Sequence, residues 1–167
     1  MKAYKFLTAD GRGLFSRFAW PAPGAAPGQW IEADVAPCTA GIHACRRRDL
    51  SYWVSPVLYE IELDGPVSER ATKVVAPRGR LVRRIDTWNE QAREEYSQMC
   101  IARAAEIAAS APGQLGLWAP SPDGSTAGPA LMGYVAARVA EAAGGVEAYT
   151  DERARQSHWL ADRLGLD

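Results

Sequence analysis

The sequence predicts an α+β fold, in which a mainly antiparallel sheet from the N-terminal half packs with helices from the C-terminal half. Short segments that alternate apolar and polar residues dominate positions 1–85, as in half-buried strands. Residues 86–110 instead hold mainly Ala, Glu, Gln and Arg among their non-aromatic side chains, and these residue types favour helices. The chain has 167 residues, 47% of them hydrophobic, which suffices for a substantial core. We therefore expect a single domain over 1–167, with a β-rich part at 1–85 and a helical part at 86–167.

Two strands joined by a turn are expected at the N-terminus. Residues 2–7 and 14–18 are rich in apolar side chains and flank the turn-forming segment TADGRG, which is the pattern of a β-hairpin. The segment 21–29 holds three prolines and two glycines. Proline fixes φ and lacks a backbone donor, so this segment is expected to be a surface loop.

The middle of the chain predicts a short helix and then strands. Residues 49–54 have helical character that ends before Pro56, because the residue preceding a proline disfavours the α region. Residues 57–63 alternate, with further strands at 72–76 and 81–85. The alternation places four side chains on one strongly buried face: Val57, Tyr59, Ile61 and Leu63.

Three helices and one long loop are expected in the C-terminal half. Apolar residues near helical spacing predict a helix over 86–110, and two more are expected at 130–143 and about 149–164. The segment 111–129 is too rich in Pro and Gly for regular structure. Long loops of this kind often act as lids or binding loops, so Trp118 within it is of interest.

Composition and charge limit the function classes. The N-terminus lacks the continuous apolar segment of a signal peptide, so we expect a soluble cytoplasmic protein with no membrane partner. Three cysteines cannot all pair with one another, which argues against a disulfide framework. Residues 1–85 carry 13 Lys and Arg against 8 Asp and Glu, whereas residues 86–167 carry 6 against 12. This asymmetry suits an anionic ligand near the first half, although contact between the two halves explains it equally well.

The segment PCTAGIHAC at residues 37–45 concentrates the chemically reactive side chains. Cys38, His43 and Cys45 have the right ligand types for zinc, but the spacing matches no familiar site and requires a distant fourth ligand such as Cys100 or His158. If residues 41–45 form a strand, His43 and Cys45 project from one face, as a ligand pocket would require. A zinc site is therefore the weaker hypothesis and a ligand pocket the stronger one.

Cys45 is also a candidate nucleophile. His43 lies two residues before it and three arginines, residues 46–48, follow it, and nearby positive charge lowers a thiol pKa. A buried thiol that only packs in the core is the competing interpretation. Arg78, Arg80, Arg83 and Arg84 could extend a basic surface, but no glycine-rich phosphate loop or nucleic-acid-binding motif accompanies them, which argues against a nucleic-acid partner.

The runs AYKF, CTAGIHAC, DLSYWV and VLYEIELDG carry a resemblance over about residues 1–85. CTAGIHAC resembles a family of phage and bacterial proteins with a C-x-x-G-[FI]-H-A-C segment, for which no activity is established. The order of a Gly-Ile strand, a helix with serine and aromatic residues, and an LYEIEL strand also looks like the central part of ADP-ribosyltransferases. That likeness implies a pocket for NAD.

The ADP-ribosyltransferase resemblance assigns roles by position. Tyr4 and Lys5 would lie where the first strand of that family holds the NAD ribose, and His43 would replace the family's tyrosine. Tyr52 and Trp53 would lie on the pocket helix. The family's catalytic glutamate on a late strand has no counterpart, because RLVRRID places arginines there.

These observations lead to one hypothesis and two alternatives. We expect a pocket near Tyr4, His43, Cys45 and Trp53 that binds a nucleotide-like or other small anionic ligand. Arg46 would neutralise the anion, Trp53 would stack on a flat ring, and His43 would serve as hydrogen-bond donor or general acid and base. The alternatives are a non-catalytic protein-interaction module, whose C-terminal helices contact a partner, and a small zinc-stabilised domain.

Overall fold

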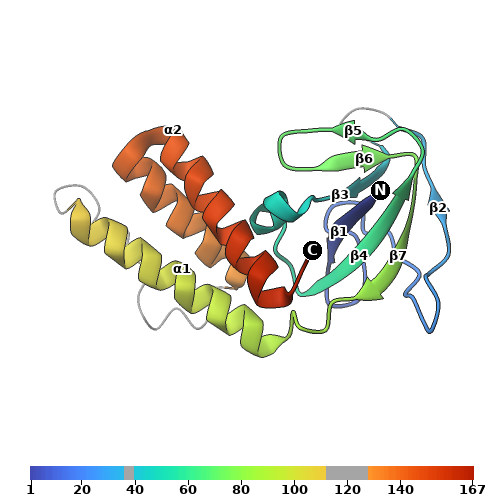
Figure 1. Ribbon diagram of the computed structural model, residues 1–167, viewed down its shortest axis with the longest axis horizontal. Coiled ribbons are helices and arrows are strands. Elements are labelled where there is room, and N and C mark those ends of the chain that lie inside the picture. The colour runs from blue at the N-terminus through green and yellow to red at the C-terminus, as the bar shows by residue number, and fades with distance from the viewer. Residues whose placement is uncertain (36–39, 112–127) are drawn as a thin grey trace. The chain divides into compact units, whose positions relative to one another are not determined.

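The structure, a computed structural model, describes residues 1–35, 40–111 and 128–167. It divides into two compact units, residues 1–88 and residues 89–167. All strands of the described residues lie in the first unit, and the helices α1 (Glu90–Ser110) and α2 (Pro129–Leu164) form the second (Figure 1). The α+β class is thus confirmed, and the boundary lies close to the expected one after residue 85.

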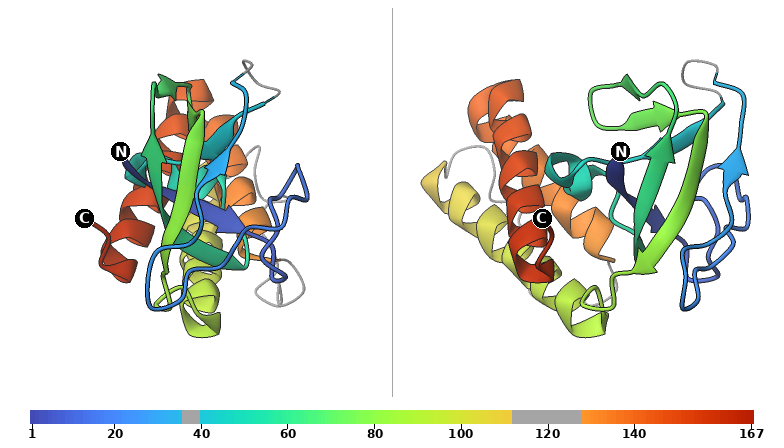
Figure 2. Two further views of the ribbon diagram at one scale, coloured as in Figure 1. Left: turned by 90° about the vertical axis from the view of Figure 1, so that its right-hand side faces the viewer. Right: turned by 45° about the vertical axis from the view of Figure 1, so that its right-hand side comes forward.

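The first unit contains two antiparallel sheets. One has four strands in the order β1-β4-β7-β2, and the other has three in the order β3-β6-β5. Strand β4 lies between β1 and β7 (Figures 1 and 2). A 3-10 helix, η1 (Arg47–Tyr52), follows β3. The strands are β1 (Lys2–Leu7), β2 (Ile31–Glu32), β3 (Ile42–Ala44), β4 (Val57–Asp64), β5 (Ser68–Glu69), β6 (Val74–Ala76) and β7 (Arg78–Arg84).

One apolar core joins these two sheets. The alternation predicted for residues 57–63 is confirmed, because the four expected side chains of β4 all belong to this core. Trp20 and Ile31 are partly buried and pack against this core. Its other buried members are Ala3, Leu7, Ile42, Ala44, Val74, Ala76 and Leu81.

The predicted N-terminal hairpin is only half correct. Strand β1 forms as expected, but residues 14–18 form a turn instead of a second strand. The Gly13 amide donates to the Phe18 carbonyl at 2.9 Å, and the Gly13 carbonyl accepts from the Arg17 amide at 3.0 Å. Arg17 has a φ of 57°, which an extended strand does not allow. These backbone contacts close the segment on itself.

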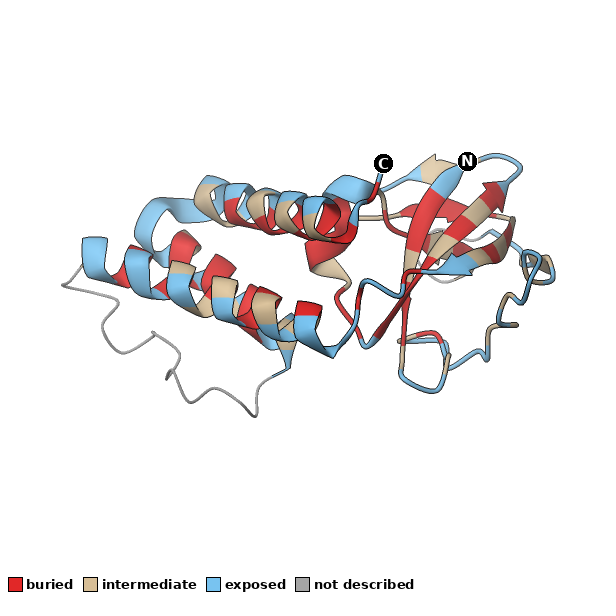
Figure 3. Cartoon of the chain, turned by 60° about the horizontal axis from the view of Figure 1, so that its bottom comes forward, coloured by how far each residue is buried: buried red, intermediate tan, exposed pale blue. Residues whose placement is uncertain are grey.

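The second unit is helical throughout its described length. Asn89 caps α1 by accepting a hydrogen bond from the Ala92 amide at 3.0 Å. α2 is interrupted at Gly145, where φ is 83°, so it consists of two segments that correspond to the helices expected at 130–143 and 149–164. Each helix carries its buried residues mainly along one side (Figure 3). Trp118 of the expected loop lies outside the described residues.

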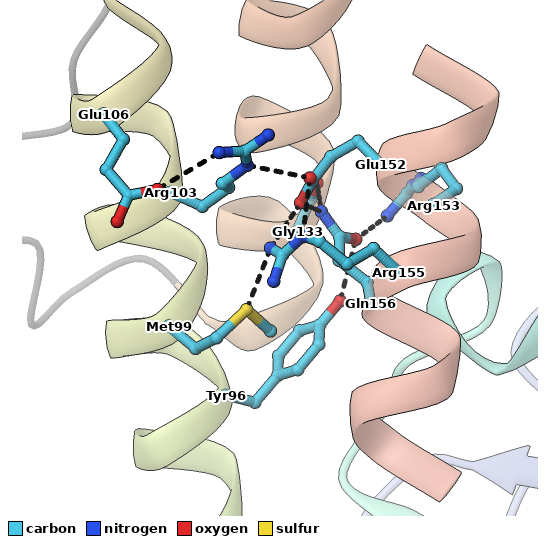
Figure 4. A network of polar contacts seen from close by, with 9 residues as sticks. All are labelled: Tyr96, Met99, Arg103, Glu106, Gly133, Glu152, Arg153, Arg155 and Gln156. Carbon is cyan, nitrogen blue, oxygen red and sulfur yellow. Dashed lines mark hydrogen bonds and ion pairs between the residues drawn. The ribbon is translucent and has the colours of Figure 1, made fainter. Parts of the chain in front are cut away.

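A polar network lies between α1 and both segments of α2 (Figure 4). The Gln156 amide donates to the Gly133 carbonyl at 3.0 Å and to Glu152 Oε1 at 2.9 Å, while its oxygen accepts from the Tyr96 hydroxyl at 3.1 Å. Burial raises the pKa of Glu152, but hydrogen bonds from Arg155 and Gln156 outweigh this effect and leave it below its usual value. In the described part of the chain, no helix has the length and apolar character to cross a membrane.

Candidate functional site

The arginines of β7 do not form an open basic surface. They pair with carboxylates of β4, which lies beside β7 in antiparallel register. Arg84 contacts Asp86 at 3.3 Å in the same way. Their charges are therefore compensated on the sheet itself. The pairs on β4 are Arg78 with Asp64 at 3.3 Å, Arg80 with Glu62 at 2.7 Å and Arg83 with Glu60 at 3.0 Å.

An open cavity of about 580 Å³ lies beside β2 and the end of β4. Its charged lining residues are Glu32, Asp34, Asp64 and Arg78. Arg78 also lies 3.5 Å from Glu32, so it partly neutralises the acidic wall. None of the residues predicted to bind a ligand lines this cavity.

Gly41 allows the chain to enter β3 close to β6. Its φ is +118°, and a Cβ atom there would lie 2.6 Å from Val75 Cγ1, so glycine is required for both conformation and space. His43 then pairs with Val75 in the β3–β6 register. Since Ile42 and Ala44 belong to the apolar core, His43 projects to the opposite face.

Two lysines approach His43 from different strands. The Lys5 ammonium, on β1, donates to the His43 carbonyl at 2.6 Å, and Lys73 Nζ lies 3.5 Å from His43 Nδ1. The other ring nitrogen, Nε2, is buried and has no hydrogen-bond partner among the described residues. Burial lowers the pKa of His43, and the charges of Lys73 and Lys5 lower it further.

Each of these lysines also lies over a tryptophan ring. Lys5 Nζ is 4.7 Å from the centroid of Trp20, and Lys73 Nζ is 5.9 Å from that of Trp53. Within the described parts of the chain, neither ammonium forms an ion pair with a carboxylate. Burial lowers the pKa of Lys5 to about 8. We call Lys5, His43, Trp53 and Lys73 the His43 cluster.

Tyr4 and Cys45 lie next to the His43 cluster but face the protein interior. Their backbones exchange two hydrogen bonds of 2.8 Å, and the Cys45 thiol donates to the Tyr4 carbonyl at 3.3 Å. Both residues are 2% exposed. Burial raises the pKa of Cys45 to about 12, so the thiol is protonated at neutral pH. This environment does not suit the nucleophile that the sequence suggested.

Arg46 has its hydrogen bonds satisfied within the protein. Its guanidinium pairs with Asp49 and lies 2.6 Å from Glu69. It also donates to the carbonyls of Arg70 and Ala71 at 2.8 and 2.9 Å. Arg46 therefore ties η1 to the β5–β6 turn, and most of its N–H groups are engaged in these contacts instead of being available to a ligand. Tyr52, also predicted to contact the ligand, ends η1 and is half-buried.

Sequence reasoning missed Lys73, Trp20 and the aromatic partner of Trp53. The partner is Phe15, whose ring meets Trp53 edge-on at a centroid distance of 6.2 Å. Lys73 and His43 come together only because β6 pairs with β3. The available signal was the position of Lys73 directly before apolar Val74 and Val75 in an expected strand.

No family model, curated protein or solved structure matches this chain. Among the residues that the structure describes, no group of three or more His, Cys, Asp or Glu side chains is arranged to hold a metal ion. Cys38 of the proposed zinc set lies outside those residues.

Proposed function

We propose that the His43 cluster binds a small anionic ligand. The observation that carries this proposal is the approach of the Lys5 and Lys73 ammonium groups to one histidine, with no described carboxylate to compensate them. Most arginines of this unit are ion-paired, in contrast to these two lysines, and those of β7 pair with carboxylates of β4. Uncompensated positive charge at a partly buried position favours an anion with several acceptor oxygens, such as a phosphate group.

His43 gives the cluster a group that can exchange a proton near neutral pH. Its pKa is lowered in the free protein by burial and by the two lysines, so its imidazole is mainly neutral at pH 7. A bound anion opposes the lysine charges and raises this pKa. Ligand binding is therefore coupled to proton uptake, and His43 is the residue we assign to proton transfer if the ligand is chemically converted.

The geometry favours different binding residues from those that the resemblance to ADP-ribosyltransferases implies. Tyr4 is buried and Arg46 is engaged with Asp49 and Glu69. We therefore assign the anion contacts to Lys5, His43 and Lys73. NAD remains one ligand to test, because its diphosphate has the required charge.

Calorimetric titration with inorganic pyrophosphate tests the proposal. Lys73→Gln should weaken binding about tenfold or more, because a hydrogen bond to a charged group is worth about 1.5–3 kcal/mol. Lys2→Gln is the matched control on β1, since Lys2 lies 3.7 Å from Glu60, outside the cluster. His43→Ala should also weaken binding, with His158→Ala, an exposed histidine paired with Asp162, as its control.

The proposal predicts that the control variants bind like the wild type. If the wild type binds none of pyrophosphate, ADP and NAD, the proposal is wrong, and the protein-interaction module becomes the better hypothesis. Equal weakening by Lys73→Gln and Lys2→Gln would also contradict it, because binding would then depend on overall charge alone.

A further inference from the structure

We infer that the ring pair Phe15 and Trp53 is a nucleobase site, which makes the ligand a nucleotide with a single base. This inference rests on the proposed function, because the nucleotide's phosphate would occupy the anion site of the His43 cluster. The anion site and the nucleobase site contact different parts of the ligand. They can therefore be tested separately.

Trp53 is a fixed platform beside the anion site. Its ring nitrogen donates to the Thr72 carbonyl at 2.6 Å, which holds the indole against the segment that leads into β6. The next residue, Lys73, places its ammonium 5.9 Å from the Trp53 centroid and 3.5 Å from His43 Nδ1. One short segment thus positions both the ring and the cation.

Phe15 is presented to solvent although its side chain is large and apolar. It is 85% exposed and meets Trp53 at an interplanar angle of 88°. The turn that carries it is well defined, with backbone hydrogen bonds between Gly13 and both Arg17 and Phe18. A phenylalanine held in this way leaves most of its ring available to a ligand.

Two perpendicular rings offer a corner for a third flat ring. A base in this corner stacks on one ring and meets the other edge-to-face, both of which are favourable aromatic geometries. Bases stack on protein aromatics with little dependence on their identity. A phosphate one ribose away from the base would then reach the charges of Lys73 and His43. This combination selects a ligand that carries both a flat ring and an anion.

The neighbouring aromatic pair of Phe18 and Trp20 does not offer an equivalent site. Phe18 meets Trp20 edge-on at a centroid distance of 5.7 Å, and Lys5 lies over the Trp20 ring. This group therefore has the same three residue types as Phe15, Trp53 and Lys73. However, Trp20 packs against the apolar core. Of the phenylalanines in these two described pairs, Phe15 is the more exposed, at 85% against 44% for Phe18. We therefore assign one base to the Phe15–Trp53 pair, which favours a nucleoside mono- or diphosphate over a dinucleotide.

The test compares ADP with pyrophosphate and adenosine in calorimetric titrations. The wild type should bind ADP about tenfold or more tightly than pyrophosphate, within the range that stacking of one base provides. Phe15→Ala should remove this advantage and leave pyrophosphate binding unchanged. Phe18→Ala is the matched control from the same turn and should retain the preference for ADP. Since Phe15 is exposed, its variant is expected to fold, which circular dichroism verifies.

The outcomes separate the two proposals. Equal affinities of the wild type for ADP and pyrophosphate overturn the nucleobase site and leave the anion site intact. Equal affinities for ADP and adenosine overturn the anion site instead. A single-stranded oligonucleotide that binds more than about tenfold more tightly than ADP overturns the assignment to a free nucleotide, because contacts along a strand would then dominate.

Discussion

Lys5 is a residue of the proposed site that lowers the stability of the folded protein, because its charge is buried. It occupies a position of β1 between Ala3 and Leu7, both of which belong to the apolar core. Burial lowers the pKa of Lys5 from its ordinary value of 10.5 to about 8. The charged form is thus disfavoured in the folded protein, and no described carboxylate compensates it. A charge kept at such a cost points to binding, because stability and function often conflict at active positions.

Replacement of Lys5 by methionine should stabilise the protein and abolish anion binding. A tenfold change in proton affinity corresponds to about 1.4 kcal/mol, and the lost hydrogen bond to His43 offsets part of the gain. We therefore expect Lys5→Met to raise the free energy of unfolding by about 1–3 kcal/mol at neutral pH, measured by urea denaturation.

The pH dependence of this effect has a definite sign. Above pH 8 the folded protein loses the Lys5 proton, whereas the unfolded chain keeps it until about pH 10.5. Because the unfolded state then binds more protons, wild-type stability rises with pH in this window, and the advantage of Lys5→Met shrinks. Lys2→Met, at an exposed position of the same strand, should change little. An advantage that grows between pH 8 and 10 would contradict this account.

At the scale of elements, close packing between α1 and α2 depends on Gly133. A Cβ atom at this position would lie 2.4 Å from the Tyr96 hydroxyl and 3.1 Å from Gln156 Oε1. Both atoms belong to the network of Figure 4, in which they share a hydrogen bond. Neither can move away without breaking a buried polar contact.

Gly133→Ala is therefore expected to destabilise the protein, although alanine favours helices. We expect a loss of about 1–3 kcal/mol, the usual cost of overpacking a core, measured by thermal unfolding. Gly24→Ala is the control, because no atom lies within 4 Å of the Cβ position there. Equal stability of Gly133→Ala and the wild type would show that the helices can separate slightly at no cost.

The elements also show what the sequence could predict. Alternation over residues 57–63 and helix-forming composition after residue 86 are local signals, and both led to correct elements. The segment 14–18 has strand-like composition, but backbone hydrogen bonds of Gly13 turn it into a loop that carries Phe15. The contact of His43 with Lys73 depends on the pairing of β3 with β6. Such pairing between distant segments leaves no local pattern, so the sequence does not predict that Lys73 contacts His43.

The role of His43 stays a prediction, whereas the structure gives Cys45 and Arg46 other roles. Spacing placed His43 and Cys45 on one face of a strand, yet the Cys45 thiol is buried against Tyr4. The Arg46 guanidinium donates to the Glu69 carboxylate and to the carbonyls of Arg70 and Ala71. A basic run in a sequence does not reveal which of its charges will be paired in the fold.

At the scale of the whole molecule, the distribution of charge makes a prediction about salt. Residues 1–88 carry 13 Lys and Arg against 9 Asp and Glu, and residues 89–167 carry 6 against 11. The unit that holds the His43 cluster is thus positive as a whole, although the protein has a net charge of −1. An anion is then attracted at short range by Lys5 and Lys73, and at longer range by the net positive charge of residues 1–88.

Both parts weaken as ions screen the charges, since the screening length falls from about 10 Å at 0.1 M salt to about 3 Å at 1 M. We expect the dissociation constant of pyrophosphate to rise about tenfold between about 0.05 and 0.5 M sodium chloride. Adenosine, which has no charge, should bind the Phe15–Trp53 pair equally well at both concentrations. A pyrophosphate affinity independent of salt would mean that the lysines do not attract the anion, whereas parallel loss of both ligands would indicate a general effect of salt on the fold.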